Sequence, residues 1–368
     1  MATTPIRLLD LAPVSPVRSQ TIYHAVGYAL GPDSPDTIML VSPDAPYVSI
    51  GRHQDAEREV DLEYCAAAGY PVIRREVGGG AVYLDGDQLF TQWIFQAEHL
   101  PATVEQRFVV YADTLVRTYR ALGIAAEHRP INDIHVAGRK IGGTGAARMD
   151  RAEVVVGSLM FDFDVATMAR VLRVPSEKFR DKIIQSLTDY MTTMHKELGE
   201  APPRATVIAA YVEACEAVLG RRLELGELRP DELAMAEQFD ARFASREWLE
   251  DAGGLRKPFV KIHEGVRLAE AAHKAPGGLI RCVLRIRDGQ VDDVAFSGDF
   301  TARPASMPAD LDELLVGSEL SEAAIAARII DYYQRVHPEI PGVAPDDWVA
   351  AVMRAAETEM PAAAGAGR

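Results

Sequence analysis

Cysteine is scarce in this sequence, and long apolar runs are absent. The chain has 368 residues and three cysteines, Cys65, Cys215 and Cys282, none of them at the spacing of a CxxC motif or of zinc ligands. A disulfide framework and a cysteine-based zinc site are therefore not expected. The first residues, MATTPIRLLD, lack the apolar core of a secretory signal, and no stretch approaches a membrane-spanning length. We expect a protein of the reducing cytoplasm with no membrane partner.

Positive charge is also in short supply. The chain carries 39 Lys and Arg residues against 54 Asp and Glu residues, which gives a formal net charge of −15. Because a net anion repels phosphate backbones, nucleic acid is not an expected partner. An anionic substrate would have to be held by a local group of cations and backbone N–H groups. The 48% hydrophobic content is typical of a soluble globular protein, and the length suits two domains.

Residues 1–250 alternate β-favouring segments with segments of helical periodicity, which predicts an α/β domain. A helix that contains Cys65 is expected to begin at Asp55 and to stop at Gly69, and Asp164 is well placed to cap another. A hairpin is expected to turn at Ala137-Gly138. The expected strands lie at residues 47–50, 72–73, 89–95, 131–136 and 154–163.

A second, smaller module is expected after the glycine-containing residues 251–254. From residue 280 to 286, apolar residues alternate with other residues, and Asp288-Gly289 supplies a turn into a second strand. The helix that follows is expected to bury one face, formed by Ile325, Ile329, Ile330 and Tyr333. We therefore predict a small α+β domain over residues 255–355 and a flexible tail over residues 356–368.

The most informative run contains two arginines and three consecutive glycines, in RREVGGGAVY from Arg74 to Tyr83. Three glycines lose much backbone entropy in a regular element, so they fit a position where a ligand lies against bare backbone. Converging N–H groups and an arginine fork are suited to phosphate or carboxylate. A flexible surface loop with two solvated arginines remains the alternative interpretation.

A second run, NDIHVAGRKIGGTG, extends from Asn132 to Gly145 and places Lys140 at the start of a return strand. A lysine among small residues reaches a ligand without steric competition. Its ammonium suits a carbonyl oxygen or phosphate that gains negative charge during a reaction. An exposed turn lysine is the alternative, because most lysines are exposed.

Together these runs resemble lipoate–protein ligases of the biotin/lipoate ligase superfamily. The resemblance covers residues 47–194 in the same order, through Gly157-Ser158-Leu159, PSEKF at 175–179 and Met191-Thr192-Thr193. A further stretch, from Lys261 through HKAPGGLIR to SGDF at 297–300, resembles the family's accessory domain, which is fused in some members and encoded separately in others. The resemblance implies a class II synthetase-like catalytic domain, with a mixed sheet flanked by helices.

The implied reaction has two steps. Lipoate or octanoate and MgATP form an acyl-adenylate, and a lysine of a carrier-protein domain then attacks the acyl carbonyl. The resemblance makes Lys140 the catalytic lysine, places Asn132 and Asp133 on the nucleotide side, and implies a contact of Asp133 with the Mg²⁺ that accompanies ATP. The remaining expected substrate-binding and nucleotide-binding residues are Arg75, Val77, Gly78, Gly79, Gly80, Ala81, Tyr83, Gln88, Gly142, Thr144 and Gly157.

The sequence departs from the family pattern at several positions. Leu84 stands where many members have His, and Gln88 where a number of bacterial members have Asn. Val155-Val156 replaces a His-His pair, and Thr144-Gly145 a pair that contains Ser. Gln54 matches a family position near the acyl-adenylate, and the HKAPGG turn at 273–278 either reaches the phosphates or only reverses the chain.

Two alternative functions stay open. The first is a carrier-to-protein octanoyl or lipoyl transferase without ATP; many transferases of this superfamily use a cysteine nucleophile. We expect Cys65 and Cys282 to be core residues, and none of the three cysteines lies at a matching motif position, which disfavours that mechanism. The second is a non-catalytic lipoate or acyl-adenylate binding protein, which would not need an electrophilic Lys140.

Overall fold

The structure is a computed structural model that describes residues 4–251, 255 and 266–358. Within these residues the chain forms two compact units. The first unit holds residues 4–51, 56–77 and 81–249, and the second holds residues 52–55, 78–80 and the described residues from 250 to 358. Lys261, at which the resemblance to the accessory domain begins, lies outside the described residues, and so does most of the predicted tail.

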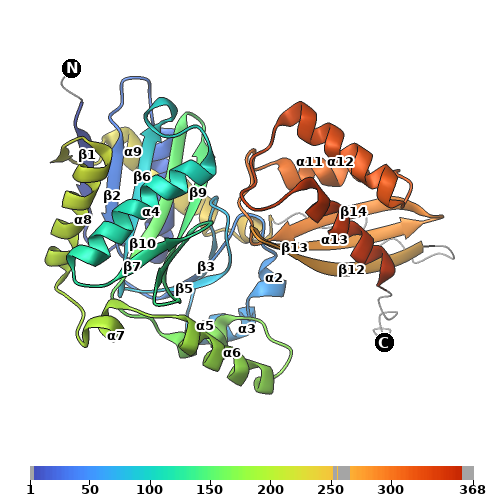
Figure 1. The fold of residues 1–368 in the computed structure, drawn as a ribbon, viewed down its shortest axis with the longest axis horizontal. Helices are drawn as coiled ribbons and strands as arrows, with labels where there is room; N and C mark the ends of the chain where they lie inside the picture. The colour runs from blue at the N-terminus through green and yellow to red at the C-terminus, as the bar shows by residue number, and fades with distance from the viewer. Residues whose placement is uncertain (1–3, 252–254, 256–265, 359–368) are drawn as a thin grey trace. The chain divides into compact units, whose positions relative to one another are not determined.

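The first unit is built on a mixed eight-stranded sheet with the order β11-β1-β2-β6-β10-β9-β8-β7 (Figure 1). The β11-β1-β2 part is parallel, and the other pairings are antiparallel. Its strands are β1 (Ile6–Asp10), β2 (Thr37–Val41), β6 (Gln88–Gln96), β7 (Ala126–Arg129), β8 (Asp133–Val136), β9 (Arg139–Met149), β10 (Ala152–Met160) and β11 (Leu223–Leu225). A smaller sheet has the order β4-β3-β5, from β3 (Tyr47–Ile50), β4 (Val72–Arg74) and β5 (Val82–Leu84).

Helices cover both faces of the large sheet. Residues of α4 and α8 pack into the core on one face, and residues of α1 and α9 pack on the other. The helices of this unit are α1 (Pro16–Tyr28), α2 (Ala56–Glu59), α3 (Leu62–Ala68), the 3-10 helix η1 (Ala97–His99), α4 (Val104–Ala121), α5 (Val165–Val171), α6 (Glu177–Tyr190), α7 (Met194–Leu198), α8 (Arg204–Leu219), α9 (Pro230–Phe243) and α10 (Arg246–Glu250).

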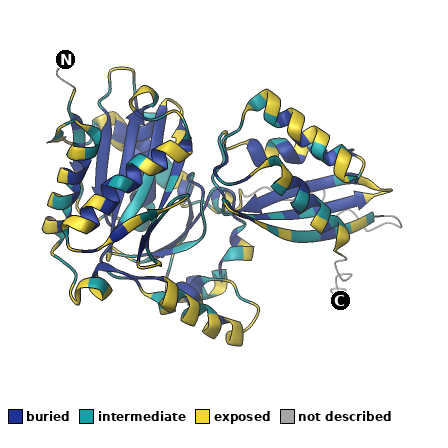
Figure 2. Cartoon of the chain, in the orientation of Figure 1, coloured by how far each residue is buried: buried dark blue, intermediate teal, exposed yellow. Residues whose placement is uncertain are grey.

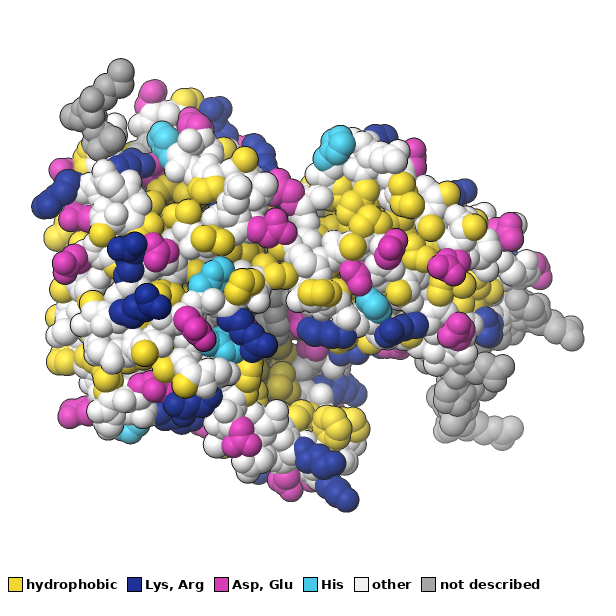
Figure 3. Space-filling model, viewed as in Figure 1, with side chains coloured by type: hydrophobic (Ala, Val, Ile, Leu, Met, Phe, Trp, Pro, Cys, Tyr) yellow, Lys and Arg dark blue, Asp and Glu magenta, His cyan; other side chains and the backbone are white. Residues whose placement is uncertain are grey.

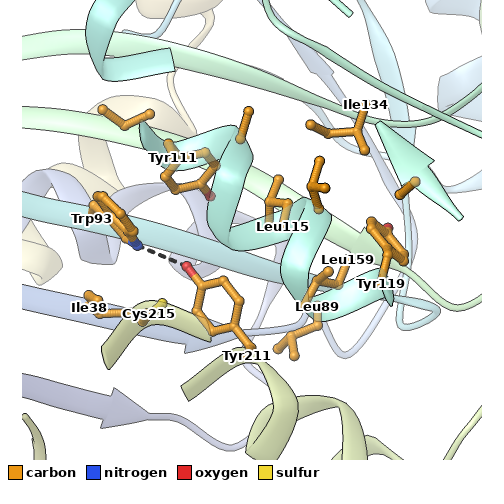
Figure 4. Packing of buried hydrophobic residues seen from close by; sticks show 14 of the residues in the cluster. Ile38, Leu89, Trp93, Tyr111, Leu115, Tyr119, Ile134, Leu159, Tyr211 and Cys215 are labelled. Atoms are coloured by element: carbon orange, nitrogen blue, oxygen red, sulfur yellow. Dashed lines mark hydrogen bonds between the residues drawn. The ribbon is translucent and has the colours of Figure 1, made fainter. Parts of the chain in front are cut away.

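Alternation along β6 separates the two cores. Trp93 and Phe95 point to the α4 and α8 side, whereas Ile94 belongs to the core beside α1. In the first core the indole of Trp93 donates a hydrogen bond to the Tyr211 hydroxyl over 2.8 Å (Figure 4). Figure 2 shows the large sheet as an almost continuously buried layer under helices that are exposed on their outer faces. This burial on both faces fixes the register of the strands that carry the site.

The helix predicted from Asp55 to Gly69 is two helices. The chain breaks at Val60-Asp61 because Val60 pairs with Leu172 and the Asp61 N–H donates to the Val171 carbonyl over 2.9 Å. The Asp61 side chain then caps α3 by accepting from the Tyr64 N–H over 3.0 Å. Gly69 ends α3 in the left-handed conformation, as predicted.

The second unit is an antiparallel three-stranded sheet packed with helices. The predicted hairpin turns at Asp288-Gly289, which have φ values of 49° and 76°. On α12, Ile325, Ile329 and Tyr332 are buried, but Ile330 is 42% exposed, so its predicted place on the buried face is wrong. The elements are β12 (Val266–Ala275), β13 (Gly278–Arg287), β14 (Gln290–Gly298), α11 (Met307–Leu315), α12 (Glu322–Val336) and α13 (Pro345–Glu357).

The surface carries both signs of charge. On the face of the first unit shown in Figure 3, basic and acidic side chains are interspersed among polar and apolar ones. Within the described residues, no helix combines the length and the apolar character needed to cross a membrane.

Candidate functional site

The hairpin of β8 and β9 brings two predicted site residues together. Ala137 and Gly138 form its turn with φ values of 49° and 80°, and Lys140 pairs with His135 next to a bulge. The Lys140 Nζ atom lies 2.7 Å from the Asp133 Oδ1 atom. Both side chains are partly exposed, at 29% and 23%, so the ammonium is available to a ligand. The predicted hairpin therefore places Asp133 and Lys140 side by side.

Two residues that the sequence reasoning missed surround the other carboxylate oxygen. The Tyr190 hydroxyl, at the end of α6, lies 3.4 Å from Asp133 Oδ2 and 3.4 Å from His135 Nε2. Burial, and then the charge of Asp133, raises the pKa of Tyr190. His135 was readable from the pattern, because residues two apart on a strand share a face. Tyr190 was not, because α6 and β8 meet only in the folded chain.

Asn132 and Thr144 are joined by hydrogen bonds that their main-chain carbonyl groups accept. The Asn132 side-chain amide donates to the Thr144 carbonyl over 2.7 Å, and the Thr144 N–H donates to the Asn132 carbonyl over 2.8 Å. The Thr144 hydroxyl donates to the same carbonyl over 3.2 Å. These bonds fix the entry to β8 immediately before Asp133. Direct contact of either residue with a nucleotide stays a prediction.

Glycines clear the space around Lys140. A Cβ atom on Gly143 would lie 3.2 Å from Lys140 Nζ and 3.5 Å from Asp133 Oδ1. A Cβ atom on Gly157 would lie 3.0 Å from both the Gly143 carbonyl oxygen and the Tyr111 ring. Gly142 is less crowded, with the Ser158 carbonyl oxygen at 3.4 Å. The missing side chain of Gly143 therefore leaves space for the Lys140 ammonium, and that of Gly157 leaves space for the Tyr111 ring in the core.

The two arginines of the RREVGGG run have different environments. Arg74 is buried, and its guanidinium donates to the carbonyls of Gly51 and Trp248, so it ties the end of this unit to the small sheet. The Arg75 guanidinium donates to the Ser49 hydroxyl over 3.2 Å. Burial lowers the pKa of Arg75, while the hydroxyls of Tyr23 and Tyr47 act in the opposite direction. Arg74 has a structural role, and the role of Arg75 toward a substrate stays a prediction.

The predicted substrate-binding or nucleotide-binding residues Val77 and Tyr83 lie in two hydrophobic clusters. Val77 packs with residues of α1 and of the large sheet, including Tyr23. Tyr83, with Ala81 packed beside its cluster, lies with three methionines and residues of the small sheet. The methionines are Met160, Met168 and Met191. The structure thus places both side chains in apolar surroundings but does not put them in one cluster.

Several buried polar atoms in the first unit have no hydrogen-bond partner among the described residues. The Tyr23 hydroxyl, the Gln88 Nε2 atom and the Gln92 Oε1 atom are among them. Gln88, one of the predicted substrate-binding and nucleotide-binding residues, is 1% exposed. Because buried polar groups normally find a partner, such atoms indicate places for a ligand or a water molecule. Tyr23 and Gln92 carry no motif signal that would have identified them from the sequence.

The glycines of the run, Gly78 to Gly80, fall in the second unit. There a Cβ atom on Gly78 would lie 2.5 Å from the Phe300 carbonyl oxygen, and Gly79 has a φ value of 97°. Both positions therefore require glycine for backbone reasons. The convergence of these glycines with Lys140 of the first unit stays a prediction.

The cysteines are unsuited to nucleophilic attack. Cys65, Cys215 and Cys282 are all buried. Burial raises the pKa of Cys65 to about 11 and that of Cys215 to about 12, and it raises the pKa of Cys282 as well. The thiolate is the reactive form, so these thiols are inert near neutral pH. Within the described residues, no group of three His, Cys, Asp or Glu side chains is arranged to hold a metal ion.

Comparison with known proteins identifies the family. The model for the lipoyl protein ligase A/B catalytic domain matches residues 22–216. An octanoyltransferase, LipM of Kyrpidia tusciae, is 31% identical over 238 residues, which are 58% of this chain and 86% of that protein. Lipoate-protein ligase A subunit 1 of Thermoplasma acidophilum is 30% identical over 230 residues, which are 58% of this chain and 83% of that protein.

A solved structure shows the same fold. A bi-partite lipoate protein ligase from Thermoplasma acidophilum, described with its E2 lipoyl domain, superposes with a TM-score of 0.62 at 25% identity. The superposition covers 71% of this chain and 100% of the Thermoplasma chain. The predicted α/β fold of the biotin/lipoate ligase class is confirmed by this likeness. The chain belongs to the lipoyl protein ligase A/B catalytic domain family, whose named relatives include lipoate ligases and octanoyltransferases.

Proposed function

We propose that the protein is an ATP-dependent lipoate–protein ligase that joins lipoate or octanoate to a lysine of a lipoyl carrier domain. The observation that carries this proposal is the Lys140–Asp133 pair in a hairpin kept open by Gly143. A mobile ammonium beside a glycine-lined space suits a substrate that gains negative charge as it reacts. The relatives named lipoate ligases supply the substrate class.

In the first step the acyl carboxylate attacks the α-phosphate of ATP. A carboxyl–phosphorus anhydride forms, and pyrophosphate leaves. Negative charge builds on the α-phosphate oxygens, and Lys140 would stabilise it there. Arg75 and the N–H groups of Gly78 to Gly80 would hold the phosphates, with Gln88 toward the adenine and Asn132, Gly142, Thr144 and Gly157 around the nucleotide.

In the second step the amine of the carrier lysine attacks the acyl carbonyl. An amide bond forms, the amine loses a proton, and AMP leaves with the electron pair of the broken bond. The ammonium of Lys140 would stabilise the oxyanion on the acyl carbonyl. Ala81 and the apolar side chains of Val77 and Tyr83 would line the path of the acyl tail.

Magnesium would enter with ATP. Mg²⁺ is usually held by one or two carboxylates together with substrate phosphates, so a single carboxylate at Asp133 fits such an ion. When bound, Mg²⁺ supplies charge compensation on the phosphates. The cytoplasmic location stays a prediction.

The second candidate is a carrier-to-protein octanoyl transferase that does not use ATP. The 31% identity to an octanoyltransferase favours it. The burial of all three cysteines disfavours a cysteine-linked acyl intermediate. A nucleophilic thiol would need exposure and a depressed pKa, whereas the pKa values of Cys65 and Cys215 are about 11 and about 12.

Isotope exchange between pyrophosphate and ATP tests the proposal. We expect exchange only when lipoate or octanoate is present, followed by a mass increase of a lipoyl domain that acts as acceptor. Variants with Cys65, Cys215 or Cys282 changed singly to Ala should keep this exchange. Acyl transfer from an acyl-carrier thioester without any exchange would contradict the ligase and establish the transferase. Tight binding of lipoate with neither activity would indicate a binding protein.

A further inference from the structure

The carboxylate of Asp133 has a different partner on each oxygen. Its Oδ1 atom lies 2.7 Å from Lys140 Nζ, and its Oδ2 atom lies 3.4 Å from the Tyr190 hydroxyl. The His135 Nε2 atom lies 3.4 Å from this hydroxyl and 3.8 Å from Oδ2. Asp133 therefore lies between the ammonium of Lys140 and the side chains of Tyr190 and His135.

His135 is buried, and Tyr190 is 37% exposed at the end of α6. His135 is 1% exposed, and its ring meets the Tyr190 ring edge-on with centroids 5.6 Å apart. Directly after Tyr190, Met191 pairs with Lys140, and the Thr192 N–H donates to the Lys140 carbonyl over 2.9 Å. The end of α6 is thus fixed to β9, and the hydroxyl is aimed at Asp133.

In the proposed reaction Lys140 must leave Asp133 in order to reach a developing anion. A partly buried carboxylate that loses its lysine partner is less stable unless other groups take up hydrogen bonds to it. A tyrosine hydroxyl can donate a hydrogen bond, and a carboxylate can only accept one. A distance of 3.4 Å is long for such a bond, and catalytic hydrogen bonds often shorten only as the reaction proceeds.

We propose that Tyr190, backed by His135, is a positioning residue whose hydroxyl holds the Asp133 carboxylate when Lys140 moves to the reacting acyl phosphate. This inference rests on the proposed function for its kinetic consequence. Its structural part, the stabilisation of a released Asp133, does not depend on the substrate. His135 lies within the run from Asn132 to Gly145 that carries the family resemblance, whereas Tyr190 lies outside the quoted motif runs.

Kinetics of the full chain with lipoate and MgATP test the consequence. Tyr190→Phe keeps the ring and removes the hydroxyl, so we expect kcat for adenylation to fall roughly three- to tenfold, as for the loss of one hydrogen bond to a charged group. The KM for lipoate should change less than about twofold, because the bond matters after binding. The control is Gln185→Met on the same helix, which removes an exposed 2.8 Å bond to the Asp189 carboxylate. It should match the wild type.

Crystal structures give a readout that needs no turnover. In Lys140→Met, Asp133 has lost its cation, and we expect the distance from the Tyr190 hydroxyl to Oδ2 to shorten from 3.4 Å toward about 2.7 Å. A hydroxyl that stays at its distance or turns to solvent would overturn the proposal, whether or not the enzyme is active. A Tyr190→Phe variant with the kcat of the control would overturn it too. If pyrophosphate exchange fails in the wild type but the distance shortens, only the proposed function is lost.

Discussion

At the scale of single residues, basic side chains that are adjacent in the sequence have different partners. The buried guanidinium of Arg74 donates hydrogen bonds to backbone carbonyls. The guanidinium of Arg75 donates to the Ser49 hydroxyl, and the hydroxyls of Tyr23 and Tyr47 act on its pKa. Arg139 pairs with Glu197 over 2.8 Å at the surface, whereas Lys140 pairs with Asp133 inside the hairpin. The adjacent residue is therefore a natural control for each proposed role.

Replacement of Lys140 tests the proposed role of its ammonium. We expect Lys140→Ala to lower the rate of adenylation roughly a hundred- to a thousandfold, because a preorganised charge at the developing oxyanion is lost. Lipoate-dependent pyrophosphate exchange measures the effect. Arg139→Ala, which removes only a surface ion pair, should stay close to the wild type. Full activity of Lys140→Ala would remove this lysine from the mechanism.

At the scale of elements, the two strands β9 and β10 place glycines with different tasks on neighbouring positions. The sequence predicted a short return strand at Lys140-Ile141, but β9 runs to Met149 because β10 pairs along it from Ala152 to Gly157. Gly157 is paired with Thr91 and Thr144 on its two sides, and Gly143 is paired with Asp133. The two glycines have different neighbours: Gly143 lies next to the end of the Lys140 side chain, and Gly157 lies next to the Tyr111 ring.

The pair Gly143→Ala and Gly157→Ala separates these tasks. A methyl group at Gly143 meets the flexible end of Lys140, so we expect activity to fall roughly ten- to a hundredfold through misplacement of the ammonium. Stability should hardly change. A methyl group at Gly157 meets backbone and the Tyr111 ring, so we expect a loss of about 1–3 kcal/mol in the free energy of unfolding.

Urea denaturation and pyrophosphate exchange on both variants are the measurements. Gly143→Ala with wild-type activity would show that the lysine has room to spare. Gly157→Ala with wild-type stability would show that Tyr111 moves aside at no cost.

At the scale of the whole molecule, each unit has its own core. The hydrophobic cluster of the second unit contains only residues from Ala269 onward, and the four other clusters lie in the first unit. Arg74, bound to the carbonyls of Trp248 and Leu249, closes the first unit at its end. Two independent cores make separate folding of the units a reasonable expectation.

Separation of the units tests the predicted accessory role of the C-terminal part. We expect a chain of residues 1–254 to fold cooperatively and to lose adenylation roughly tenfold or more, because a bound substrate would be positioned less well. Transfer from supplied acyl-adenylate to a lipoyl domain should be affected much less. Addition of the separate C-terminal chain should restore adenylation in part. Equal losses in both steps would mean that the second unit only stabilises the fold.

The sequence alone predicted much of the local structure. Turn residues such as Asp288-Gly289 and caps such as Asp164 act through their own backbone and immediate neighbours, so they are visible in the chain. The break at Val60-Asp61 was not predicted, because it depends on pairing with Leu172, more than a hundred residues away. The buried face of α12 was assigned partly wrongly, because Ile330 is apolar but lies off the spacing of the buried residues.

For the site, the sequence by itself determined which chemical groups are available: an arginine–glycine run, a hairpin lysine and a nearby aspartate. Their order and spacing, with the motifs that follow as far as residue 194, were enough to recognise the family. Only the tertiary structure decided that Tyr190 lies beside that aspartate and that Arg74 is structural. The reason is physical: these contacts join elements that are distant in the chain, and packing, not local preference, brings them together.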